Sequence, residues 1–338
     1  MRNFSILIVI VLLTGSTIID SRAQSDFQFF NKSGELPERL LKTRSVIFMN
    51  VDKLNWEVEA RKIHKSFVSI GIDAVAYYAL SDILSGHDAT NSFYQDITDR
   101  SISSMIIVNE TDQGFSIYLG KIPEGGSFFE SNMSVYSLSA PSLEELGDIL
   151  VNRVEQSDLE RENFLIIDVP EIFKRTNVIK TRRVTDFNAD LRIDKLAVPK
   201  FESGVMIKGN VAEMNAELDT LLKNNYPFKY GLVAPNLSDD EMISQGYLMV
   251  LRKLENNVES LKRMLGYDLK AGETIHISTI KGNPNELVKI FAEQRAHKYY
   301  IQQLYTKDIY LGNIWDAGKT WQTALLHHLN NLALDLKK

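Results

Sequence analysis

Short apolar runs alternate with amphipathic helical patterns along this chain, and this alternation constrains its fold more than any other feature. Residues 44–51 (RSVIFMNV) form an apolar run rich in β-branched side chains, which is typical of a buried strand. Residues 55–71 follow with apolar side chains at helical spacing and end on Gly71, a residue type that often terminates helices. The run at 72–80 again has the pattern of a strand. A strand, a helix and a strand in succession predict an α/β fold.

The rest of the first half continues this alternation. We expect a helix that ends near Arg100 and another over 141–156, with Ser142 as its N-cap in a capping box. Between them, residues 103–108 and 115–122 predict two strands of an antiparallel hairpin. The predicted order of this unit is therefore β-α-β-α-β-β-α.

The second half predicts the same order of elements. Strands are expected over 203–209, 228–234 and 273–280, and helices over 211–225, 239–265, 284–294 and 320–336. The longest helix is predicted from apolar residues at steps of three and four: Tyr247, Leu251, Leu254, Val258, Leu261 and Leu265. A hairpin over 298–314 turns near Lys307.

A short motif also recurs. Residues 117–122 (IYLGKI) reappear as 309–314 (IYLGNI), each in the outgoing strand of a predicted hairpin. Extending this alignment upstream matches four apolar pairs: Met105 with Tyr299, Ile107 with Ile301, Ile97 with Phe291, and Phe93 with Leu287. The sequence therefore predicts a duplication, with two similar α/β sandwich units and mixed sheets that each contain an antiparallel hairpin.

The amino terminus has the pattern of a secretory signal peptide. Arg2 precedes an apolar run, and Ser21 and Ala23 are small residues at the expected cleavage positions. Together with the absence of cysteine, this predicts a periplasmic or secreted protein with no transmembrane segment after cleavage. The formal net charge of −6 argues against a general nucleic-acid binder.

These observations predict five segments. They are a signal peptide at 1–23, a flexible segment at 24–42, a first α/β unit at 43–170, a basic linker at 171–200, and a second unit at 201–338.

The stretch GNIWDAGKTW, residues 312–321, ends like a nucleotide-binding P-loop. Five residues separate its glycines where a P-loop has four, so the backbone amides would not wrap a phosphate in the usual way. A turn accounts for Gly318, and N-capping accounts for Thr320. An NTPase that uses Gly318, Lys319 and Thr320 with an upstream carboxylate such as Asp168 remains an alternative, but no cofactor is expected.

The sequence contains no complete motif for metal binding or nucleophilic catalysis. The histidines form no metal-binding pattern, and no nucleophile motif is complete. A hydrolase built on distant carboxylates is a further alternative, with no residue singled out. The basic segment and the aromatic hairpin instead indicate contacts with a protein partner, for which we single out Arg182, Arg183, Tyr300 and Trp315.

Residues 67–84 (FVSIGIDAVAYYALSDIL) run from a helix through a glycine and a strand into a leucine-rich helix. This passage resembles envelope α/β domains of the TolB amino-terminal and curli-secretion-channel type. The signal sequence ending at Ala23-Gln24 is similar to those of secreted Bacteroidota proteins. The resemblance implies an accessory role in the envelope, so we expect a non-enzymatic binding or scaffold protein with an envelope protein as partner.

Overall fold

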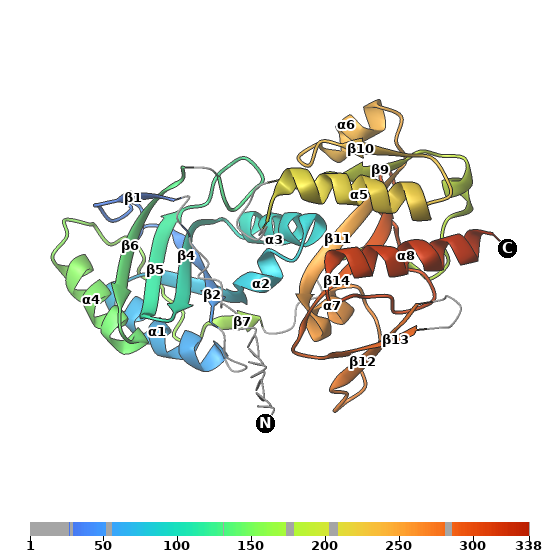
Figure 1. Ribbon diagram of the computed structural model, residues 1–338. Helices are drawn as coiled ribbons and strands as arrows, with labels where there is room; N and C mark the ends of the chain where they lie inside the picture. The colour runs from blue at the N-terminus through green and yellow to red at the C-terminus, as the bar shows by residue number, and fades with distance from the viewer. Residues whose placement is uncertain are drawn as a thin grey trace, which may run out of the picture.

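The computed structural model describes residues 27, 30–51, 56–130, 132–173, 179–202, 209–280 and 286–337 (Figure 1). It confirms the α/β class, because helices cover two mixed sheets that each contain an antiparallel hairpin.

The first sheet has the strand order β1-β6-β5-β4-β2-β3-β7. Its strands are β1 (Asn31–Ser33), β2 (Arg44–Asn50), β3 (Asp73–Ala79), β4 (Ile102–Thr111), β5 (Gly114–Lys121), β6 (Ser134–Ala140) and β7 (Glu171–Phe173). β2 runs parallel to both β3 and β4, whereas β4, β5 and β6 are antiparallel neighbours. The helices of this unit are α1 (Trp56–Ile70), α2 (Leu80–Ile83), α3 (His87–Asp99) and α4 (Leu143–Glu155). The predicted N-cap of α4 is confirmed, since the Ser142 side chain accepts the Glu145 amide.

The second sheet has the order β10-β9-β11-β14-β15-β8. Its strands are β8 (Arg183–Val184), β9 (Leu196–Pro199), β10 (Tyr230–Val233), β11 (Met249–Asn257), β14 (Arg295–Gln303) and β15 (Ile309–Tyr310). The helices are α5 (Val211–Asn225), α6 (Asp239–Ser244), α7 (Val258–Met264) and α8 (Trp321–Leu336), with a 3-10 turn at Ala189–Arg192. Two further strands, β12 (Ile275–Ile280) and β13 (Glu286–Phe291), form a separate antiparallel ribbon.

The two large sheets share one topology. Six strands of the first sheet, in the order β1-β6-β5-β4-β2-β3, correspond to β8-β15-β14-β11-β9-β10 of the second, and every neighbouring pair has the same relative direction. α1 and α5 connect equivalent strands, and α4 and α8 follow equivalent strands. The recurring motif, however, lies on strands that are not equivalent, because 117–122 begins on β5 whereas 309–314 begins on β15, the counterpart of β6.

The predicted long helix over 239–265 is wrong. Ser238 and Glu241 form a capping box that starts α6, and Gly246, with φ of +84°, follows its last turn. The chain then enters β11, whose side chains are buried on both faces of the sheet, Leu251 on one and Leu254 on the other. A strand buried on both faces loses its period of two, so its apolar residues can match helical spacing by coincidence.

The predicted helix over 284–294 is also wrong, because residues 286–291 form β13, the partner of β12. The motif alignment therefore fails upstream of the hairpin. Phe93 and Ile97 are buried on α3, whereas their matched residues Leu287 and Phe291 are exposed on a strand.

Two segments predicted to be a flexible start and a linker contain strands, and two other predicted segments lie outside the described residues. Residues 24–42 were expected to be flexible, yet β1 joins the edge of the first sheet and Phe30 is buried. The segment 171–200 supplies β7 to the first sheet and β8 and β9 to the second. The predicted signal peptide and almost all of the strand predicted at 203–209 lie outside the described residues.

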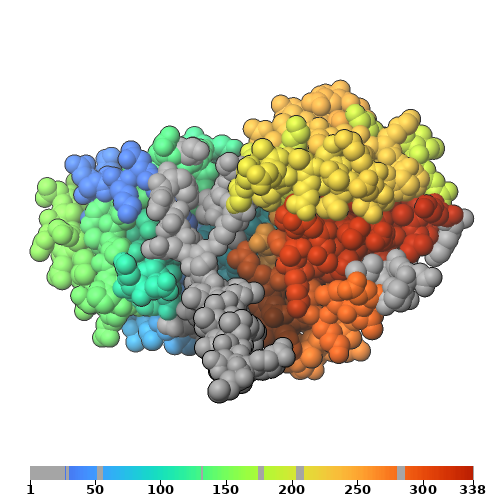
Figure 2. All heavy atoms as spheres, viewed as in Figure 1, coloured from blue at the N-terminus to red at the C-terminus, as the bar shows by residue number. Residues whose placement is uncertain are grey.

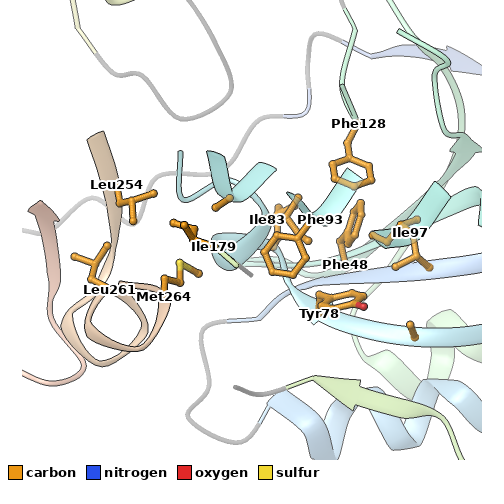
Figure 3. Close-up of a cluster of buried hydrophobic side chains, with 14 of the residues drawn as sticks. Phe48, Tyr78, Ile83, Phe93, Ile97, Phe128, Ile179, Leu254, Leu261 and Met264 are labelled. Atoms are coloured by element: carbon orange, nitrogen blue, oxygen red, sulfur yellow. The ribbon is translucent and has the colours of Figure 1, made fainter. Parts of the chain in front are cut away.

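Helices α2 and α3 lie between the two large sheets, so the molecule is layered as α1 and α4, first sheet, α2 and α3, second sheet, α5 and α8 (Figure 1). Figure 3 shows Ile83 and Phe93 of the central helices between Phe48 of the first sheet and Leu254 of the second. One continuous hydrophobic core therefore joins the units.

Candidate functional site

The near-P-loop occupies the turn between the second sheet and α8. The Gly318 amide donates to the carbonyl of His297 at 3.0 Å, and the His297 amide donates back to the Gly318 carbonyl at 2.8 Å. A side chain at position 318 would place its Cβ 2.4 Å from the Ala324 amide nitrogen, which explains the glycine. Thr320 caps α8 by accepting the Thr323 amide at 3.2 Å, and Lys319 is exposed. Gly318 and Thr320 thus have structural partners within the chain.

Asp168, the carboxylate considered for nucleotide hydrolysis, is exposed in the first unit, directly after Ile167, whose carbonyl bonds to His64 of α1. Lys319 precedes α8 in the second unit. Among the hydrogen bonds and ion pairs of the described residues, none joins Asp168 to Lys319.

Buried charged side chains also hold the turn before α8, and one of them, Lys298, comes from β14 of the second sheet. The Lys298 ammonium lies 2.6 Å from Asp316 Oδ1, and both side chains are fully buried. His328 Nδ1 and Asn331 Nδ2 of α8 lie 3.1 Å from Asp316 Oδ2. Burial raises the pKa of Asp316, but the charge of Lys298 and the contact with His328 lower it to about 2. Asp316 is therefore ionised at neutral pH and joins β14 to α8.

A second polar group lies in the seam between the units. The Tyr300 hydroxyl donates to Asp88 Oδ2 of α3 at 2.5 Å, and Arg252 Nε lies 3.3 Å from Asp88 Oδ1. Arg252 also forms an ion pair with Asp239 at 2.5 Å. Burial raises the pKa of Asp88, but the hydrogen bonds from His87 and Tyr300 and the charge of Arg252 bring it below its ordinary value. These bonds orient the central helices on the second sheet.

Tyr300 is therefore buried in the seam and is not available to a partner at the surface. Tyr299 and Tyr300 face opposite sides of β14, so a sheet with one solvated face would expose one of them. Both are buried, since helices of different units cover the two faces of this sheet.

The other residues singled out for partner binding have different surroundings. Trp315 is buried, with its ring 4.9 Å from that of Tyr267. Arg183 donates to the carbonyls of Ile179 and Met264 at 2.8 and 3.2 Å. Arg182 is exposed, 3.7 Å from Asp308. The structure thus does not bring the four residues together on one face.

A third polar group lies at the carboxyl end of β11, where open α/β sheets often bind ligands. Glu255 accepts a hydrogen bond from Arg295 at 2.9 Å and lies 3.5 Å from both Lys253 Nζ and His297 Nδ1. Burial lowers the pKa of His297 to about 4, so this ring is neutral at pH 7. The charge of Glu255 is compensated by Arg295 and Lys253. These contacts join β11 to β14.

The β12–β13 ribbon carries the exposed apolar surface that best fits contact with a partner. Ile275 (40% exposed), Ile277 (49%), Leu287 (61%) and Phe291 (45%) all lie on its outer face, where Ile275 pairs with Phe291. The inner face buries Ile290 together with His276 and Ser278. In Figure 2 this region (orange) lies at the surface beside α8 (red). The sequence does not reveal this face, because the apolar residues of β13 have the spacing of a helix, although apolar and polar residues alternate in β12.

No protein-family model, curated protein or solved structure matches this chain. Within the described residues, no helix is long and apolar enough to cross a membrane, and no group of three or more metal-ligating side chains is present.

Proposed function

We propose that this chain is a non-enzymatic binding or scaffold protein of the periplasm or the extracellular space, and that the outer face of the β12–β13 ribbon contacts its protein partner. The observation that carries this proposal is that the ribbon carries apolar side chains on its solvent-facing side as well as on its inner side. Strands at a protein surface commonly turn their apolar side inward and their polar side to water. Here the inner face buries Ile290 together with His276 and Ser278, while four apolar side chains on the outer face remain exposed.

A contiguous apolar face of this kind is typical of a contact site. Leu287, Phe291 and Ile277 would each lose much of their exposed surface under a partner, and full burial of such a side chain is worth about 1.5–3 kcal/mol. Because these residues stand on paired strands, little conformational entropy would be lost when they bind.

The charge on this face indicates the chemistry of the partner. Lys289 pairs with Ile277 in the ribbon register and is exposed between the apolar residues. It has no ion pair with another described residue. We therefore infer a protein surface that is apolar and presents a carboxylate to Lys289, in place of a lipid surface or a second copy of this chain.

The compartment is part of the proposal. The signal-like pattern at 1–23 and the resemblance of 67–84 to envelope domains both support an extracytoplasmic location. An envelope protein is accordingly the expected partner.

The test begins with a photo-crosslinking amino acid at Leu287, with the exposed Leu334 of α8 as the matched control position. A protein crosslinked from Leu287 and not from Leu334 is then purified, and its affinity for the chain is measured directly. We expect Ile277→Thr combined with Leu287→Thr, and separately Lys289→Glu, to weaken binding at least about tenfold, which is 1.4 kcal/mol. Leu334→Gln should leave the affinity unchanged.

The proposal fails if Leu287 crosslinks only to lipid or to a second copy of the chain. It also fails if the ribbon variants bind the purified protein as tightly as the wild-type chain does. Because the replaced residues are exposed, the melting temperatures of the variants should stay close to that of the wild type. This measurement separates loss of binding from loss of folding.

A further inference from the structure

A small cavity of about 240 Å³ opens at the amino ends of the parallel strands of the first sheet, far along the chain from the ribbon. Arg44 begins β2, Asp73 begins β3 and Glu171 begins β7, while Arg100 follows α3. Parallel strands bring their first residues to one edge, so two guanidinium groups and two carboxylates converge there.

The charged groups of this cavity do not fully satisfy one another. Arg100 Nη2 bonds to Glu171 Oε2 at 2.7 Å, but Arg44 Nε comes only within 3.8 Å of Asp73 Oδ2, which is too long for a hydrogen bond. Asp73 is buried, and its Oδ1 has no hydrogen-bond partner among the described residues. Burial accordingly raises the pKa of Asp73, although Arg44 opposes this effect. The charge of Asp73 is therefore incompletely compensated by the groups around it.

The remaining walls of the cavity are apolar. Val75 and Ile102 come from the sheet, and Leu165 and Ile167 come from the segment between α4 and β7. Leu165 and Ile167 are also among the exposed apolar side chains of the molecule, so a ligand in the cavity would cover part of their surface. The cavity is smaller than the roughly 300–1,000 Å³ of pockets for drug-sized ligands, which limits the ligand to the size of a single amino acid.

We propose that this cavity binds a free amino acid with an apolar side chain, whose carboxylate contacts Arg44 and Arg100 and whose ammonium group contacts Asp73. Guanidinium groups suit carboxylates because they present several N–H donors in a plane, and the bonds described above use only part of them. The ammonium group contacts Asp73 Oδ2, which Arg44 approaches only to 3.8 Å. The apolar side chain of the ligand packs on Val75, Ile102, Leu165 and Ile167.

The first test uses the wild-type chain alone, so it does not depend on any variant folding. Isothermal titration calorimetry compares L-leucine with three analogues that each lack one feature: 4-methylpentanoate without the ammonium group, isoamylamine without the carboxylate, and glycine without the apolar side chain. We expect L-leucine to bind at least about tenfold more tightly than each analogue. No binding of L-leucine at about 10 mM, or equal binding of 4-methylpentanoate, would overturn the proposal.

The second test locates the site. Asp73→Asn and Arg44→Gln should each weaken L-leucine binding at least about tenfold, whereas Asp148→Asn and Arg61→Gln, on exposed faces of α4 and α1, should not. Asp73→Asn should keep the wild-type melting temperature, because a neutral amide replaces a buried carboxylate. Unchanged affinity in both site variants would place leucine elsewhere and refute the assignment.

Discussion

Replacing Lys298 with methionine tests the buried ion pair that holds the turn before α8. The substitution keeps a long apolar stem and removes the ammonium group that lies 2.6 Å from Asp316 and donates to the Tyr299 carbonyl at 2.6 Å. Asp316 would then be fully buried without a cationic partner, with only His328 and Asn331 as polar neighbours. Breaking one side of a buried pair in this way costs about 3–5 kcal/mol.

The assay is urea denaturation of the chain from Gln24 onward, monitored by tryptophan fluorescence, because Trp315 and Trp321 flank this turn. Lys298→Met should lower the free energy of unfolding by about 3–5 kcal/mol, and the double variant Lys298→Met with Asp316→Asn should recover part of that loss. Lys121→Met is the control, since its partner Glu124 is fully exposed and no measurable loss is expected.

The pH dependence gives an independent check. The pKa of Asp316 lies at about 2, below its ordinary value of 3.8, so this carboxylate contributes about 2 kcal/mol that is complete above pH 4 and lost as the pH falls through 2. Removing Lys298 should shrink this acid-dependent loss. If Lys298→Met costs less than about 1 kcal/mol, or the double variant loses the full sum of the two singles, the ion pair does not hold the turn as argued.

Three further substitutions have definite expected outcomes. Tyr300→Phe removes the hydrogen bond to Asp88 across the seam and should cost about 1.5–3 kcal/mol in urea denaturation; an unchanged midpoint would contradict the seam described above. Gly318→Ala should destabilise the chain by about 1–3 kcal/mol because its Cβ would meet the Ala324 backbone, whereas Gly34→Ala, where a Cβ meets nothing within 4 Å, should not. Burial raises the pKa of Asp82 from 3.8 to about 6, so wild-type stability should fall by about 3 kcal/mol between pH 4 and 6, and Asp82→Asn should abolish that fall; parallel pH profiles would refute it.

The sequence predicted those elements whose signals are local. β2, α1 and β3 follow from short apolar runs and helical spacing, and the caps at Ser142 and Thr320 follow from single residues at helix starts. The second half was harder to predict because one face of its sheet is covered by helices from the first half of the chain. These helices are α2 and α3, more than a hundred residues earlier in the chain, so the burial of Leu254 and Tyr300 has no local signal.

The same non-local packing explains why Tyr300 and Trp315, predicted to contact a partner, are buried. Aromatic residues on a hairpin favour an exposed face only if nothing covers that hairpin. Tyr300 and Trp315 instead fill the space between the units, while the exposed apolar face lies on a ribbon whose second strand has the residue spacing of a helix. The cavity at the strand starts was likewise invisible, because Arg44, Asp73 and Glu171 are brought together only by strand order.

The shared helical layer also determines how binding at the surface can act on the rest of the molecule. Separating the units would expose the apolar core around Ile83 and Leu254 and break the polar contacts of Asp88 and of Asn256, whose amide donates to Asp82 at 2.7 Å. These costs far exceed what a small ligand in a 240 Å³ cavity returns on binding, so an opening hinge between the units is not available at low energy. The ribbon and the cavity therefore stand on one rigid body. Saturating the cavity with L-leucine should leave the affinity of the ribbon for its partner unchanged, and a shift of more than about threefold would show that the layer between the sheets moves.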